Sequence, residues 1–109
     1  MSIADSIDAL LHTKQSFEDN ESDVLARCPD DTTRGTVRAA VVRARDNYNA
    51  AINKVLCADD VLMRGLIGDI EDNRRTFEDL VEKDGHLAMV LNGLSTGVMI
   101  GAKIVALLK

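Results

Sequence analysis

The two histidines are the side chains of this sequence best suited to proton transfer or metal binding. Each follows a carboxylate by four residues, Asp8 before His12 and Glu82 before His86, so each pair would share one face of a helix. A di-metal centre in a helical bundle needs two ExxH motifs and a zinc protease needs HExxH, and the sequence contains neither. We therefore expect exposed or capping histidines, with no metal and no cofactor.

The two cysteines, Cys28 and Cys57, lie 29 positions apart and form no CxxC motif. Each ends an expected helix, and in an antiparallel hairpin those ends point to opposite poles, so a disulfide between them is not expected. Neither has a histidine near it in sequence, and GxSxG and glycine-rich phosphate loops are missing. We expect no enzyme, and reduced thiols that fit a cytoplasmic address.

Arginines form the third set of reactive groups. Arg34, Arg38 and Arg45 would share one helix face, with Arg27 near the same turn, and could bind an anion. The alternative that we favour is pairing with acidic helices on either side. The net charge of −5 and the absence of interleaved aromatic residues argue against nucleic acid as a partner.

A stripe of glycines near the C-terminus is the most distinctive spacing in the chain. Gly93, Gly97 and Gly101 recur every four residues inside its most apolar run. Each glycine inside a helix costs roughly 0.5–1 kcal/mol relative to alanine, so we expect close approach of another backbone as compensation. We predict a glycine zipper whose interaction surface consists of Gly93, Leu94, Gly97, Val98, Gly101, Ile104, Val105 and Leu108.

Three structures would explain this stripe: a helix seated among helices of its own chain, a self-association surface, or a membrane-inserted segment. The stretch Leu87 to Leu108 has 22 residues, enough for the ~20 that a membrane span needs. Lys103 and a polar stripe of Asn92, Ser95 and Thr96 argue against a lone spanning helix, because a lysine at the bilayer centre costs roughly 2.5–3.5 kcal/mol.

The elements that carry these residues are all expected to be helices. Hydrophobic residues make up 46% of the 109 residues, aromatics only 3%, and there is one proline. Heptad seams and capping residues predict a single domain, 1–109, with helices at about 2–27, 33–57, 60–83 and 86–108. Ser2 is the expected N-cap of the first helix, and Gly85 the glycine that ends the third.

Three polar residues interrupt these seams. Lys14 and Glu21 would lie at a rim or meet opposite charges, and Asn73 would set the register or also lie at a rim. The apolar seams of the second and third helices include Val55, near Ile52 and Leu56, and Leu62, near Val61. Charge alternates along the chain, with a basic helix at 33–57 between acidic helices, and we expect the same order in space.

These patterns predict an all-α protein, an antiparallel up-down bundle of about four helices whose last helix packs centrally or in an oligomer interface. The expected function is that of an acidic, non-enzymatic interaction or assembly protein, such as a self-associating subunit, an adaptor or a secretion-type chaperone. Its expected partner is a second copy or another helical protein. The alternative is a membrane-associated protein whose last helix inserts or oligomerises in a bilayer. The N-terminus has no basic leader, so we expect a cytoplasmic address.

Overall fold

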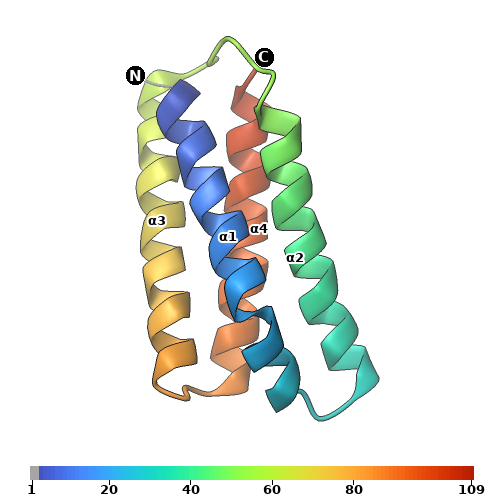
Figure 1. Cartoon of the computed structure of the whole chain (residues 1–109). Helices are drawn as coiled ribbons and strands as arrows, with labels where there is room; N and C mark the ends of the chain where they lie inside the picture. The colour runs from blue at the N-terminus through green and yellow to red at the C-terminus, as the bar shows by residue number, and fades with distance from the viewer. Residues whose placement is uncertain (1–2) are drawn as a thin grey trace.

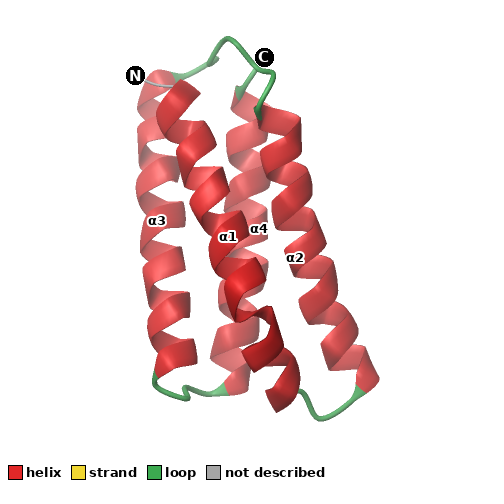
Figure 2. Cartoon of the chain, viewed as in Figure 1, coloured by secondary structure: helices red, strands yellow, loops and turns green. Residues whose placement is uncertain are grey.

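The computed structural model describes residues 3–109, which form a bundle of four helices (Figures 1 and 2). The helices are α1 (Ile3–Arg27), α2 (Asp31–Ala51), α3 (Asp60–Glu82) and α4 (Leu87–Leu107). The predicted all-α class and the antiparallel four-helix bundle are confirmed. The expected cap Ser2 lies outside the described residues.

The bundle consists of two helical hairpins, α1 with α2 and α3 with α4, packed against each other. Helix α1 contacts α2 and α3, helix α4 contacts the same two helices, and α1 also contacts α4 across the centre. Helices α2 and α3 occupy the other diagonal and do not contact each other. Figure 1 shows the connection between α2 and α3 passing over one end of the bundle, beside the C-terminus. This route explains why it is the longest of the three connections.

The second helix ends at Ala51, six residues earlier than the sequence predicts, because the following backbone pairs with the C-terminus. The N–H groups of Val55 and Leu56 donate to the backbone oxygen of Lys109 at 2.9 and 3.0 Å, and Lys109 N–H donates to Leu56 O at 2.8 Å. Ala58 N–H donates to Leu107 O at 2.7 Å. These donors would otherwise bond the preceding helical turn, so the contact with the C-terminus replaces the end of the helix.

Aspartate side chains cap the N-termini of α2 and α3. The Asp30 carboxylate accepts from Thr33 N–H at 2.8 Å, and the Asp59 carboxylate accepts from Leu62 N–H at 2.9 Å. The turn after α3 differs from the prediction, because Asp84 rather than Gly85 has the left-handed conformation, with φ of 58°. Arg27 pairs with Asp84 at 2.6 Å and donates to Val81 O at 2.7 Å, which fixes this turn against the end of α1.

The core has two clusters stacked along the bundle axis. One surrounds Phe17 and Phe77, and the other contains Leu10, Met63 and Ile104. Helix α1 also buries three small polar side chains that its predicted seam omitted, namely Ser6, Thr13 and Ser16. A stripe of apolar residues at heptad spacing is enough to pack a helix against one neighbour. Helix α1 contacts three helices and therefore buries a wider part of its surface.

Charge is divided between two sides of the bundle. The adjacent helices α1 and α3 carry most of the acidic residues, whereas α2 is basic and α4 has no acidic residue. The expectation that the basic helix lies between two acidic ones is therefore wrong, because α2 packs on α1 and α4 but does not contact α3. The α2/α4 side is free of acids along α4, and the opposite side is strongly acidic.

Candidate interaction surfaces

The predicted interaction surface on α4 lies mostly inside the chain's own bundle. Gly93, Leu94, Gly97, Gly101, Ile104 and Leu108 are buried, while Val98 and Val105 are half-buried. Helix α4 contacts all three other helices. The glycine stripe therefore meets neighbours from the same chain, the first of the three structures that the sequence left open.

Side chains, rather than another backbone, fill the space beside the glycines. A methyl group added at Gly97 would lie 2.6 Å from Phe17 Cζ, and one at Gly93 would lie 3.3 Å from the Phe77 ring. The two rings pack edge to face, with centroids 5.0 Å apart and planes at 61°. The glycines thus make room for the aromatic pair at the centre of the core, which offsets part of their cost in helix propensity.

Two asparagines reach the backbone of α4 beside the same glycines. Asn73 Nδ2 donates to Gly93 O at 2.9 Å, and Asn47 Nδ2 donates to Val98 O at 3.2 Å. A methyl group at Gly101 would lie 2.6 Å from Asn47 Nδ2. Asn73, from α3, and Asn47, from α2, therefore fix the position of α4 from two sides. Of the two roles predicted for Asn73, this bond agrees with setting the register.

The outward side of α4 is unusually poor in charge. Lys103 is its only charged residue, and Met89 and Met99 are each 52% exposed. The exposed positions of the helix are Ala88, Met89, Asn92, Ser95, Met99, Ala102, Lys103 and Ala106. By length and composition α4 is also the one described helix that could cross a membrane, although 33% of its most apolar window is buried in the bundle.

A groove runs between the outward sides of α2 and α4. It has a volume of about 290 Å³, and its lining combines apolar side chains with one cation, Arg43. Arg43 is exposed, and no ion pair forms at its guanidinium within residues 3–109. The lining residues are Thr36, Ala40, Arg43, Leu91, Leu94, Ser95, Val98 and Met99. We call this feature the α2–α4 groove.

A second apolar surface covers the end of the bundle where α2 connects to α3. Val55 is 74% exposed, Leu56 63% and Val61 74%, and Ile52 and Leu62 are also exposed. We call these five residues the apolar end. The sequence placed Val55 and Leu62 on core seams and the other three beside them. Ile52, Val55 and Leu56 follow the end of α2 at Ala51 and lie in the connection, whereas Val61 and Leu62 lie in the first turn of α3.

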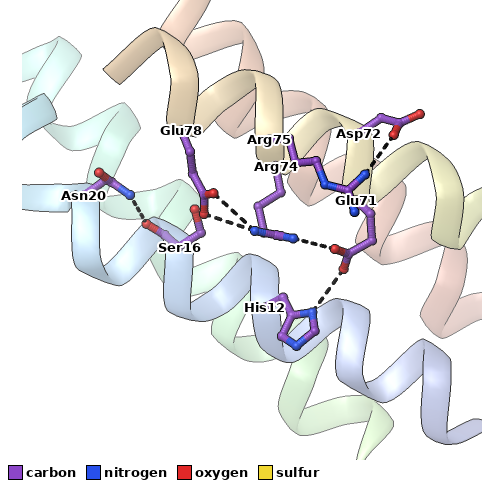
Figure 3. A network of polar contacts seen from close by, with 8 residues as sticks. All are labelled: His12, Ser16, Asn20, Glu71, Asp72, Arg74, Arg75 and Glu78. Carbon is purple, nitrogen blue, oxygen red and sulfur yellow. Dashed lines mark hydrogen bonds and ion pairs between the residues drawn. The ribbon is translucent and has the colours of Figure 1, made fainter. Parts of the chain in front are cut away.

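The α1/α3 side carries a chain of polar contacts (Figure 3). His12 Nδ1 lies 3.3 Å from Glu71 Oε1. The Arg74 guanidinium forms two ion pairs, one with Glu71 Oε2 at 2.6 Å and one with Glu78 Oε1 at 3.2 Å. The hydrogen bond with Glu71 raises the pKa of Arg74 above its ordinary value despite the opposing effect of burial. The buried Ser16 hydroxyl borders this chain without a protein partner among the described residues.

The polar middle of α1 meets opposite charges. Lys14 donates to Glu18 at 3.0 Å, Arg45 of α2 reaches the same carboxylate at 3.0 Å, and the Lys14 ammonium lies 5.9 Å from the Tyr48 ring centroid. Burial opposes ionisation of Glu18, but hydrogen bonds from Lys14 and Arg45 outweigh it, so the pKa of Glu18 lies below its ordinary value. This arrangement agrees with the second role predicted for Lys14.

Of the four arginines considered as an anion patch, three have carboxylate partners. Arg34 pairs with Asp31 at the start of α2, Arg45 with Glu18, and Arg27 with Asp84. Arg38 is exposed and forms no ion pair within the described residues. Three of the four guanidinium groups are thus engaged in separate ion pairs.

The two cysteines and His86 lie in the connections between the helices. Cys28 is buried with its thiol donating to Val24 O at 3.3 Å, and the backbone of Cys57 lies beside Leu108; both thiols are free. His86 precedes α4 and makes no capping bond. Across residues 3–109, no three histidine, cysteine or acidic side chains gather as metal ligands would. The surfaces described above therefore offer packing and charge pairing as their chemistry.

Comparison of the sequence and structure with protein-family models, curated proteins and solved structures found no match.

Proposed function

We propose that this chain is a non-catalytic interaction protein that assembles with other helical chains, foremost with copies of itself. The observation that carries the proposal is the outward side of α2 and α4, where Val42, Met89 and Met99 are exposed, Met99 lines an apolar groove, and α4 has no acidic side chain. Exposed apolar area of this kind gains about 25 cal/mol per Å² when a partner covers it. Contiguous apolar patches with polar rims are typical of protein interaction sites.

The division of charge supports self-association. One side of each copy is acidic and the other carries unpaired cations such as Arg38 and Arg43, so two copies present complementary surfaces to each other. Complementary charge steers encounter and selects orientation more than it adds affinity. The proposed surface differs from the one expected from the sequence, because the glycine side of α4 faces the chain's own core and its opposite side is exposed.

The proposal is tested by measuring the native mass of the full-length protein in detergent-free buffer. Light scattering after size-exclusion chromatography gives this mass over about a hundredfold range of concentration. Assembly predicts a mass that rises with concentration and falls at high salt, because charge pairing is screened. A monomer mass at every concentration would refute the proposal.

The alternative function is membrane association through α4. Its support is the length and mean hydropathy of this helix, 1.6 in its best window, together with a single charged residue, Lys103. Insertion would require α4 to leave the contacts of Asn73 and Asn47 and to carry Lys103 into the bilayer. Co-sedimentation of the full-length protein with neutral and anionic liposomes tests it, with Met99→Asp as control, because this variant adds a charge at an exposed position of α4. Pelleting of the wild type without pelleting of Met99→Asp would favour this alternative.

A further inference from the structure

We propose that the apolar end of one copy docks in the α2–α4 groove of a second copy, so that copies add to one another in an open chain. The inference rests on the proposed function and names the two surfaces that would meet. Of the large hydrophobic side chains that are exposed, five form the apolar end, and the remaining three are Val42 on α2 and Met89 and Met99 on α4. Both surfaces belong to every copy.

The apolar end is held in a fixed shape before any partner binds. Three backbone hydrogen bonds of 2.8 to 3.0 Å join Val55 and Leu56 to Lys109. Because these bonds fix the backbone of the connection against the end of α4, the side chains of Val55 and Leu56 stay exposed and do not pack into the core. A surface ordered in advance loses little conformational entropy on binding. The arrangement therefore suits insertion into a hollow of another molecule.

The α2–α4 groove provides the complementary hollow. Leu91, Val98 and Met99 give it an apolar floor and wall. Its volume of about 290 Å³ is sufficient for a few apolar side chains of the size of Val55 and Leu56. The groove lies on the side of the bundle while the apolar end lies at a pole, so one copy cannot fill its own groove without unfolding.

Charge selects this pairing over a symmetric one. Arg43 borders the groove without an ion pair, and Asp60, in the first turn of α3 beside Val61 and Leu62, is an exposed acid without an ion pair in the described residues. Docking brings these opposite charges together. An interface made of two such grooves would instead contain two Arg43 guanidinium groups, which repel each other. A contact between different surfaces of two copies leaves one free surface on each copy. Copies therefore continue to add, unless the rotation between them closes a ring.

The test uses one substitution on each surface. Leu56→Asp places a charge in the apolar end and keeps the backbone bonds to Lys109, and Arg43→Glu reverses the charge at the groove. Both side chains are exposed, so circular dichroism should remain that of the wild type. Leu56→Met is the conservative control for the first variant. Arg75→Glu, at an exposed arginine in the second half of α3, makes the same charge change as the second variant away from both surfaces.

Sedimentation velocity of the full chain gives the result. We expect wild type, Leu56→Met and Arg75→Glu to form species beyond a dimer, and Leu56→Asp and Arg43→Glu to associate at least about tenfold more weakly. An equimolar mixture of the two weak variants should form heterodimers and stop there, because the intact groove of Leu56→Asp accepts the intact end of Arg43→Glu.

Two outcomes overturn the inference in different ways. If the wild type assembles but Leu56→Asp assembles equally well, or the mixture forms no heterodimer, the docking is wrong while the proposed function stands. If the wild type remains a monomer at every concentration, both the docking and self-association are wrong.

Discussion

Replacement of Gly97 by alanine tests how α4 packs. The added methyl group would lie 2.6 Å from Phe17 Cζ and 3.1 Å from Asn73 Nδ2. Phe17 is completely buried and packs edge to face on Phe77, so its ring cannot move away freely. Alanine gains about 1 kcal/mol in helix propensity, and overpacking a dense core costs about 1–3 kcal/mol. We expect the free energy of unfolding to stay unchanged or to fall by up to about 2 kcal/mol.

The matched control for this substitution is Gly68→Ala in α3. Gly68 is exposed and inside a helix, and nothing lies within 4 Å of a methyl group added there. This variant should gain about 0.5–1 kcal/mol, because only the helix propensity changes. Urea titrations followed by circular dichroism at the helical band give both values. If Gly97→Ala stabilises the protein as much as Gly68→Ala, Phe17 does not pack against Gly97 and the account of the core is wrong.

Three further predictions concern the other contacts of the bundle. Asn73→Asp, which has the same shape, should lower the free energy of unfolding by at least about 1 kcal/mol, since an acceptor replaces the donor to Gly93 O; an unchanged urea midpoint would refute this bond. The pKa of Glu18 in the folded protein lies below its ordinary value, so the stability from its bonds to Lys14 and Arg45 is present above that ordinary value and is lost as the pH falls through the folded pKa. Wild type should therefore lose more stability than Glu18→Gln between neutral and acid pH in urea titrations; parallel losses would exclude this contribution. Removal of residues 86–109 takes Val90 and Ile104 out of the core and should abolish the helical circular dichroism, whereas a folded monomeric remnant would show that α4 is dispensable.

The sequence predicts the helices well because their signals are local. The start of α3 follows a capping aspartate, Asp59, and apolar periodicity identifies most of the buried positions. Helix α2 begins at Asp31 rather than at about 33, because Asp30 caps it. The end of α2 could not be predicted, because residues 52–57 continue an acceptable helical pattern. The N–H groups of Val55 and Leu56 bond instead to Lys109 O, which lies more than 50 positions away in the chain.

The arrangement of the helices explains the other differences. Short connections predict neighbours, but the link from α2 to α3 crosses the end of the bundle and separates those helices. This crossing makes α1 and α3 adjacent, which gathers the acids on one side. It also exposes the apolar end, whose residues have the types of a core.

The sequence predicts close approach of another backbone at the glycine stripe, whereas side chains lie nearest to it. The kind of neighbour could not be deduced from spacing. A stripe without side chains accommodates either another backbone or large side chains. Phe17 and Phe77 occupy that space here, and they come from helices whose register against α4 is set by the whole core. The candidate interaction surface consequently moves to the opposite side of α4, which in the sequence appeared only as a mixture of alanine, methionine and small polar residues.

The concentration dependence of the native mass tests the central claim most directly. The full-length protein, without detergent and at low salt, should show a mass that rises past that of a dimer as its concentration increases. A mass equal to that of one chain at every concentration would contradict the claim that the outward surfaces of this bundle serve assembly.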